Sequence, residues 1–323
     1  MSRYFKFFLL ALTLVVSSAA KPARHYSVVQ GWPVLPADRV LGSAAGVAVD
    51  AQGEVIVFHR AGRTWSEPLL LDKIDKPTLA VFDGRSGKFL REFGANLFAM
   101  PHGLSIDAKG NLWLTDVSLQ QVFKLSPQGK VLMVLGEQGV AGNDAKHFNR
   151  PTQVAVAPDG SFFVSDGYRN TRVVHFTADG QFIKQWGTPG TGPGEFNTPH
   201  SIAIDRSGLL YVSDRQNDRV QVFDADGRVK AIWKSPEIGR PYGVVPIGDG
   251  NFAIADGGEQ PQSGPDRSAL VIVDGKGKVI ERIGRYGNYD GQFRMAHHIA
   301  ADGSGAIYVV DITGQRVQKF TRH

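Results

Sequence analysis

Short apolar runs separated by glycine, proline and aspartate recur along the whole chain and predict β-strands. Runs such as VIVF, LWLTDV, FFVSD, LYVSD, FAIAD and IYVVD are rich in β-branched and aromatic residues, which favour strands. The 38 glycines and 17 prolines among 323 residues separate these runs, and such residues typically form turns. No stretch shows the apolar period of a long helix. The pattern therefore indicates an all-β protein.

The strands group into six copies of one repeat. The aligned copies begin at Ala45, His102, Thr152, His200, Tyr242 and His297. A second strand ends 14 residues after each of these positions, at His59, Asp116, Asp166, Asp214, Asp256 and Asp311. This constant offset across repeats of unequal length predicts a rigid two-strand core with variable loops. Third and fourth strands follow, so each repeat predicts one four-stranded blade of a six-bladed β-propeller.

The last repeat lacks a fourth strand, because the sequence ends at His323. The segment HYSVVQGWP, which starts at His25, is similar to the fourth-strand sequence QFIKQWG of the third repeat. We therefore predict that an N-terminal strand completes the last blade, which closes the ring and pairs two strand edges.

The first twenty residues have the pattern of a secretory signal peptide. Arg3 and Lys6 precede an apolar stretch from residue 7 to residue 16 and the small residues Ser-Ala-Ala at 18–20. The apolar stretch is too short to span a membrane, and we expect no other membrane span. We expect residues 1–20 to be a signal peptide, residues 21–323 to form a single propeller, and the protein to be monomeric and secreted or periplasmic.

Composition narrows the possible chemistry. The chain has no cysteine, which excludes disulfides and thiolate chemistry. The net charge of +5 is compatible with a nucleic-acid partner, but lysine and arginine are dispersed among acidic residues. Because the protein is also expected to be exported, we expect no nucleic-acid partner.

Three histidines, His102, His200 and His297, occupy the first position of alternate repeats. The first strand of each blade lines the central channel. Six blades are about 60° apart, so residues on alternate blades converge on the axis at about 120°. Three neutral imidazoles with an open fourth position are a ligand set of catalytic zinc. The pattern predicts a metal site; the alternative is that proline-histidine pairs merely punctuate the repeat.

Three further residues are expected on the same face. The second strand runs antiparallel to the first, so the turn after it overlooks the histidines. Arg60, Tyr168 and Arg215 lie in these turns. Two guanidinium groups beside a divalent cation predict an anionic ligand, because arginine binds carboxylates in bidentate fashion; the alternative is that they are solvated surface residues. The recurring aspartates occur in repeats with and without histidine, so we interpret them as turn-forming residues.

The sequences PHGLSID, SDGY and PHSIAID, in this order, resemble peptidyl-α-hydroxyglycine α-amidating lyase, a propeller built of NHL-type repeats. The resemblance runs from about Ser43 to the C-terminus. It implies cleavage of a peptidyl-α-hydroxyglycine, or a related α-hydroxy amide with a carboxylate, into an amide and glyoxylate. It also implies zinc bound by three histidines, two active-site arginines, a tyrosine and a methionine near the metal, at His102, His200, His297, Arg60, Arg215, Tyr168 and Met295.

We assign provisional roles to the three predicted active-site residues. Tyr168 is the base, which requires the cation and the arginines to favour its phenolate. Arg60 is its electrostatic partner, and Arg215 contacts the substrate carboxylate or a developing oxyanion. These roles rest on the chemistry that cleavage of a carbinolamide demands: a base, charge stabilisation and a group that holds the carboxylate.

One departure from the family concerns a second metal. Animal members place an aspartate after the third histidine, where it helps to hold a structural calcium with main-chain carbonyls at the positions of Val47 and Leu104. His298 stands at the aspartate position here, which counts against calcium. His298 is also a competing candidate for the third zinc ligand, although the repeat register favours His297.

Several alternatives follow from the same residues. The chain shows no oxidase domain to make the hydroxyglycine, so a separate monooxygenase is an expected partner. A non-catalytic secreted NHL propeller that binds protein or glycan partners is the main alternative function. A lactonase-like hydrolase would need a Glu/Asn/Asp calcium cage that the aligned positions lack, and a homologue that keeps the metal without lyase activity is a third alternative.

Overall fold

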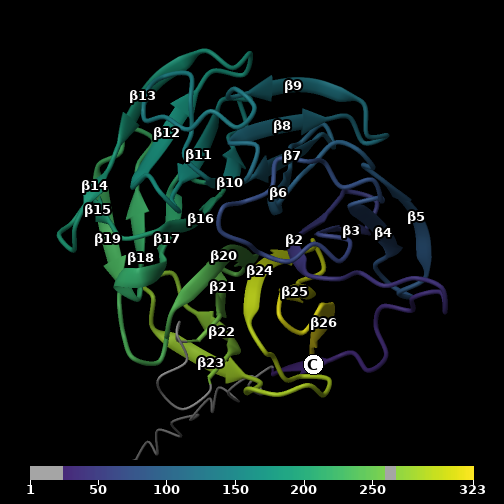
Figure 1. Ribbon diagram of the computed structural model, residues 1–323. Coiled ribbons are helices and arrows are strands. Elements are labelled where there is room, and N and C mark those ends of the chain that lie inside the picture. The colour runs from purple at the N-terminus through teal and green to yellow at the C-terminus, as the bar shows by residue number, and fades with distance from the viewer. Residues whose placement is uncertain (1–24, 259–266) are drawn as a thin grey trace, which may run out of the picture.

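The predicted all-β propeller is confirmed. The computed structural model describes residues 25–258 and 267–323, so the predicted signal peptide lies outside the described residues. Six four-stranded sheets surround a central axis (Figure 1). In five of these sheets, strands pair antiparallel in chain order from the innermost to the outermost, and the sixth sheet takes its outermost strand from the N-terminal side of the chain. No helix in residues 25–258 or 267–323 is long and apolar enough to cross a membrane.

The blades follow the six repeats. Blade 1 contains β2 (Ala44–Val49), β3 (Glu54–His59), β4 (Leu79–Asp83) and β5 (Phe89–Phe93). Blade 2 contains β6 (Pro101–Ile106), β7 (Leu112–Asp116), β8 (Gln121–Leu125) and β9 (Val131–Leu135). Blade 3 contains β10 (Pro151–Val156), β11 (Phe162–Asp166), β12 (Arg172–Phe176) and β13 (Phe182–Trp186).

The second half repeats this order with small additions. Blade 4 contains β16 (Pro199–Ile204), β17 (Leu210–Asp214), β18 (Arg219–Phe223) and β19 (Val229–Trp233), and blade 5 contains β20 (Pro241–Gly248), β21 (Asn251–Asp256), β22 (Ala269–Val273) and β23 (Val279–Ile283). A short parallel pair, β14 (Thr188–Pro189) and β15 (Glu195–Phe196), precedes blade 4, and one 3-10 turn, η1 (Arg215–Asn217), follows β17.

An N-terminal strand completes the last blade, as the sequence predicts. Blade 6 contains β24 (Ala296–Ala301), β25 (Ile307–Asp311) and β26 (Arg316–Arg322), and β1 (Tyr26–Val28) adds the outermost strand. β1 pairs antiparallel with β26, with Tyr26 opposite Arg322 and Val28 opposite Phe320. The facing edges of β1 and β26 are thereby paired, and main-chain hydrogen bonds close the ring.

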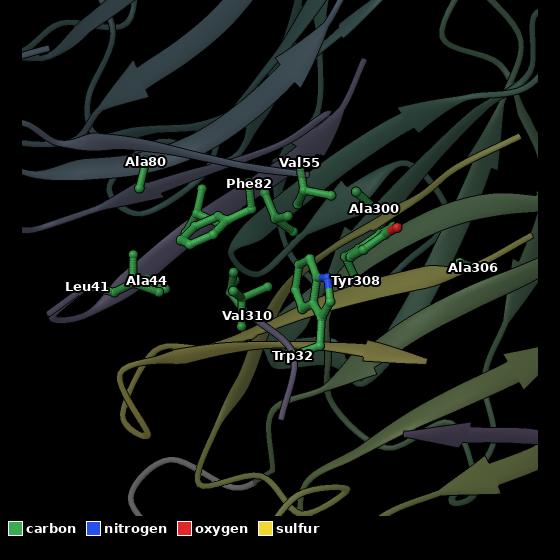
Figure 2. Packing of buried hydrophobic residues seen from close by; sticks show 13 residues of the cluster. Trp32, Leu41, Ala44, Val55, Ala80, Phe82, Ala300, Ala306, Tyr308 and Val310 are labelled. Carbon is green, nitrogen blue, oxygen red and sulfur yellow. The ribbon is translucent and has the colours of Figure 1, made fainter. Parts of the chain in front are cut away.

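Apolar packing supports this closure where blade 6 meets blade 1. Trp32, from the segment after β1, packs between Tyr308 of β25 and Phe82 of β4, with ring centroids 5.1 Å and 6.3 Å away (Figure 2). All three side chains are buried. Burial of large aromatic side chains contributes strongly to stability, which suits a chain that has no disulfide.

Every innermost strand carries a β-bulge at the first position of its repeat. In β16, Pro199 is opposite Asp214 and Ser201 is opposite Ser213, so His200 has no partner in the ladder. The same shift occurs in the other five innermost strands. A bulge redirects the side chain of its extra residue. In blades 2, 4 and 6, the residue at this bulge is His102, His200 or His297.

The recurring aspartates stabilise the turns on the face of the propeller where the innermost strands begin. Asp116 is fully buried and accepts main-chain N–H groups from Met100 and Leu119, at 2.8 Å and 2.9 Å. Asp214 is also buried and adds an ion pair with Arg219 at 2.7 Å. These contacts join the ends of strands to one another and to the adjoining connections, which agrees with a structural role.

Candidate metal centre and active site

His102, His200 and His297 meet on the propeller axis. They lie on β6, β16 and β24, the innermost strands of blades 2, 4 and 6, and all three are buried. Their ring centroids are 4.8–4.9 Å apart, and one nitrogen of each ring lies within 4.8 Å of the other two. The cluster could hold a metal ion.

The carbonyl groups of the intervening blades orient the three imidazoles. Nδ1 of His102, His200 and His297 lies 2.7–2.8 Å from the main-chain oxygens of Thr152, Tyr242 and Ala45, respectively. These acceptors are the bulge residues of blades 3, 5 and 1. Because a carbonyl can only accept, each Nδ1 carries the proton, and each Nε2 lone pair is available to a cation. Such outer hydrogen bonds orient metal ligands.

The electrostatic surroundings keep these histidines neutral. Burial holds the pKa of each of the three imidazoles well below its ordinary value. The positive charges of Arg60, beside His102 and His297, and of Arg215, beside His200, lower these pKa values further. Neutral imidazole is the form that binds zinc.

His298 points away from this cluster into the channel below it. Its Nδ1 accepts the main-chain N–H of Val47 at 3.3 Å, and its Nε2 lies 2.7 Å from Oε1 of Gln153. Burial lowers the pKa of His298 to about 4. The register therefore separates the two neighbouring histidines, and the structure brings His297, not His298, to the axis with His102 and His200.

The residues below the histidines do not fit a structural calcium. The carbonyl oxygen of Leu104 accepts a hydrogen bond from Nε2 of Gln153 at 3.1 Å, and Val47 presents its N–H to His298. The described residues that line this lower cavity, of about 240 Å³, include no carboxylate. Calcium requires six to eight oxygen ligands. A hydrogen-bonded bridge of His298 and Gln153 occupies this part of the channel.

The predicted active-site residues line one cavity above the histidines. This cavity has a volume of about 470 Å³, and Arg60, Tyr168, Arg215, Met295 and His297 all lie in its wall. Arg60, Tyr168 and Arg215 occupy the turns after β3, β11 and β17. The antiparallel return of the second strand thus brings them to the same face as the three histidines.

Tyr168 contacts two of the three histidines. Its Oη lies 3.0 Å from Nε2 of His102 and 3.0 Å from Nε2 of His200. Cζ of Arg215 lies 5.3 Å from the centre of the Tyr168 ring. Among the residues that the structure describes, Nε of Arg215 is buried without a hydrogen-bond acceptor. An anion in the cavity would satisfy this donor.

Arg60 is a buried cation. Its side chain is only 5% exposed, and its Nε donates to the carbonyl of Pro101 at 3.1 Å. Burial lowers the pKa of Arg60, whereas Tyr168 and Asp116 oppose this shift. Since arginine stays protonated even when its pKa is lowered, Arg60 places a permanent positive charge beside Tyr168.

The sequence alone did not reveal two further residues of the cavity, Tyr242 and Trp65. Tyr242 stands at the first position of the fifth repeat, and its ring lies 4.9 Å from Cζ of Arg215. Its register position was a signal that could have placed it near the axis. Trp65 belongs to the long connection between β3 and β4, where the repeat gives no register.

Comparisons with known proteins agree with this architecture. A sequence family described as a six-bladed beta-propeller matches residues 142–234. The solved structure of a streptogramin B lyase has a TM-score of 0.59 and 14% sequence identity, and covers 93% of this chain and 98% of that one. At this identity the likeness shows the fold alone.

Sequence relatives identify the family. Peptidyl-alpha-hydroxyglycine alpha-amidating lyase 2 of Drosophila melanogaster is 34% identical over 310 residues, which cover 88% of this chain and 72% of the fly protein. Peptidyl-glycine alpha-amidating monooxygenase of Mus musculus is 37% identical over 322 residues, which cover 92% of this chain and 32% of the mouse protein. The chain thus spans about a third of the length of this monooxygenase. It belongs to the family of peptidyl-alpha-hydroxyglycine alpha-amidating lyases.

Proposed function

We propose that the protein is a zinc-dependent lyase that cleaves a peptidyl-α-hydroxyglycine, or a related α-hydroxy amide, into an amide and glyoxylate. The names of its relatives support this reaction class. The observation that carries the proposal is the single cavity in which Arg60, Tyr168 and Arg215 lie above three buried histidines. This arrangement provides a base, two cations and a metal site within one substrate-sized space.

Zinc suits the donor set. His102, His200 and His297 would hold the ion through their Nε2 atoms, because each Nδ1 is already committed to a carbonyl. Three neutral imidazoles with one open position are typical of catalytic zinc. When bound, zinc supplies a Lewis acid that favours loss of a proton from a substrate hydroxyl.

Tyr168 is the proposed base. Its Oη lies 3.0 Å from Nε2 of His102 and of His200, and the guanidinium groups of Arg60 and Arg215 line the same cavity. The phenolate accepts the hydroxyl proton, and the O–H electron pair forms the C=O bond of glyoxylate. The C–N bond breaks with its electron pair on nitrogen. Tyr168 then returns the proton to that nitrogen, which leaves the peptide amide and balances the reaction.

Arg215 is the proposed contact for the substrate carboxylate. Its Nε is a buried donor without an acceptor among the described residues, and its guanidinium borders the cavity. Arginine binds a planar carboxylate through two parallel hydrogen bonds. This contact would orient the hydroxyl and the scissile bond towards Tyr168 and the histidines.

We further propose that the protein is exported and acts on substrate made by a separate monooxygenase. Export rests on the signal-like pattern of residues 1–20. The expected partner rests on the chemistry, because a C–H bond of glycine must first be hydroxylated before this cleavage is possible.

The decisive experiment measures glyoxylate released from α-hydroxyhippurate by the zinc-loaded protein. We expect turnover by wild type and a loss of turnover in Arg215→Gln, with Arg206→Gln, an arginine in the turn after β16, as a matched control. Absence of glyoxylate from zinc-loaded wild type would reject lyase activity on this substrate class.

A further inference from the structure

The connection between β3 and β4, residues 60–78, contacts the segments that precede blades 2 and 3; we call it the strap. Glu67 forms two hydrogen bonds with the guanidinium of Arg150, which precedes blade 3, at 2.7 Å and 2.9 Å. Ile74 is buried and exchanges main-chain hydrogen bonds with Phe98 and Asn96, which precede blade 2, at 2.8 Å. The strap is therefore attached to the segments that precede blades 2 and 3.

These attachments hold Trp65 at the active-site cavity. Its ring centroid lies 5.4 Å from that of Tyr168, and Cζ of Arg60 and of Arg150 lie 5.5 Å and 5.7 Å from the ring. Its Nε1 donates to Glu67 at 3.3 Å. The tryptophan is thus oriented by two cations and one carboxylate while its side chain still lines the cavity.

The cavity has buried charged and imidazole groups at its base and Trp65 at its exposed rim. His297 and Arg60 are 2% and 5% exposed, whereas Trp65 is 38% exposed. Trp65 therefore lies at the mouth, and Met295 and Ile312 also line the cavity. A substrate whose carboxylate and hydroxyl bind among the buried charges must direct its acyl group towards the mouth. The volume of about 470 Å³ leaves room for the residue that precedes the hydroxyglycine.

We infer that Trp65 binds the side chain of the residue preceding the hydroxyglycine and gives the protein a preference for peptides with an aromatic or large apolar residue there. This inference rests on the proposed lyase function and adds a specificity-determining residue to it. Aromatic rings stack favourably in offset or edge-to-face arrangements, and Trp65 offers such a surface at the cavity mouth.

The test compares two substrates, N-acetyl-phenylalanyl-α-hydroxyglycine and N-acetyl-glycyl-α-hydroxyglycine. We expect wild type to favour the phenylalanyl substrate about tenfold in kcat/KM, mainly through KM. Trp65→Ala should bring the ratio close to one, and Trp65→Phe should keep most of it. Tyr289→Ala, which removes an exposed aromatic side chain elsewhere, should keep the wild-type ratio.

A second variant tests the attachment of the strap. Glu67→Gln weakens the contact with Arg150 without removing the aromatic ring, so we expect an intermediate ratio.

An unchanged ratio in Trp65→Ala, or equal use of both substrates by wild type, would overturn the role of Trp65 while leaving lyase activity intact. Lack of glyoxylate from both substrates would instead reject the proposed function. Calorimetry with N-acetyl-phenylalaninamide, the product, then shows whether binding depends on Trp65 without turnover.

Discussion

The imidazole Nδ1 of His200 lies 2.7 Å from the carbonyl oxygen of Tyr242, the residue at the corresponding position of the next blade. The ring of the same tyrosine lies against the guanidinium of Arg215. One residue thus orients a candidate metal ligand through its main chain and a candidate substrate contact through its side chain. Geometry of this kind is preorganised, because neither group depends on a flexible surface loop.

His200→Ala should abolish tight zinc binding, because it leaves only two of the three imidazoles. We expect about one zinc ion per wild-type chain after dialysis and less than about a tenth of that in the variant, measured by elemental mass spectrometry. His147→Ala removes a partly exposed histidine that pairs with Asp144 and should retain zinc. Full zinc content in His200→Ala would place the metal elsewhere.

Tyr168→Phe should reduce kcat about 10²–10³-fold while zinc content stays at the wild-type level, since removing a general base typically has an effect of this size. The variant deletes only the oxygen that lies 3.0 Å from His102 and His200. Steady-state glyoxylate formation measures the change, with Tyr289→Phe as the control. Wild-type kcat in Tyr168→Phe would remove the tyrosine from the role of base.

Calcium should not stabilise the wild-type protein, because His298 and Gln153 bridge the lower channel. We expect millimolar calcium to leave the thermal unfolding midpoint of the zinc-loaded protein unchanged. His298→Asp places a carboxylate near the carbonyl of Leu104, so this variant should unfold at a lower temperature and regain stability when calcium is added. A clear rise of the wild-type midpoint with calcium would contradict the bridge.

Acid should destabilise the fold through His59, the buried last residue of β3. Burial lowers the pKa of His59 from its ordinary value of 6.5 to about 4. The unfolded chain therefore binds a proton that the folded chain does not, and stability present above pH 6.5 is lost as the pH falls towards 4. This one group should lower the free energy of unfolding by about 3 kcal/mol over that range.

Denaturant unfolding of wild type and His59→Gln across this pH range measures the effect. The stability advantage of wild type over the variant should shrink by that amount towards pH 4. His147→Gln is the control with the opposite sign, because Asp144 raises the pKa of His147. A constant difference between wild type and His59→Gln would show that His59 is not buried in its neutral form.

The sequence could predict the blades and the convergence of the histidines because each repeat of a propeller forms one blade. Residues at the same position of different repeats therefore differ only by a rotation about the axis. His102, His200 and His297 share a register, so their convergence needed no knowledge of side-chain packing. The antiparallel return of the second strand likewise predicted the face of Arg60, Tyr168 and Arg215. Both deductions use only symmetry and strand direction.

The remaining features depend on contacts that no register encodes. The bulges at Ala45, Thr152 and Tyr242, which leave their carbonyl groups able to accept hydrogen bonds from the histidines, depend on local strand pairing. The direction of His298 depends on Gln153, which is 145 residues away in the sequence. Trp65 reaches the cavity because Glu67 binds an arginine two blades away, and a unique connection of this kind has no counterpart in the other repeats.

The closure of blade 6 also determines the order in which the molecule can be assembled. His297 lies on the innermost strand of the blade whose outermost strand, β1, comes from the opposite end of the propeller sequence. Nδ1 of His297 lies against the carbonyl oxygen of Ala45 in blade 1, so the third imidazole acquires this partner only when blade 6 meets blade 1. Tight zinc binding would then require a closed ring. Measuring zinc uptake during refolding would therefore show when the ring has closed.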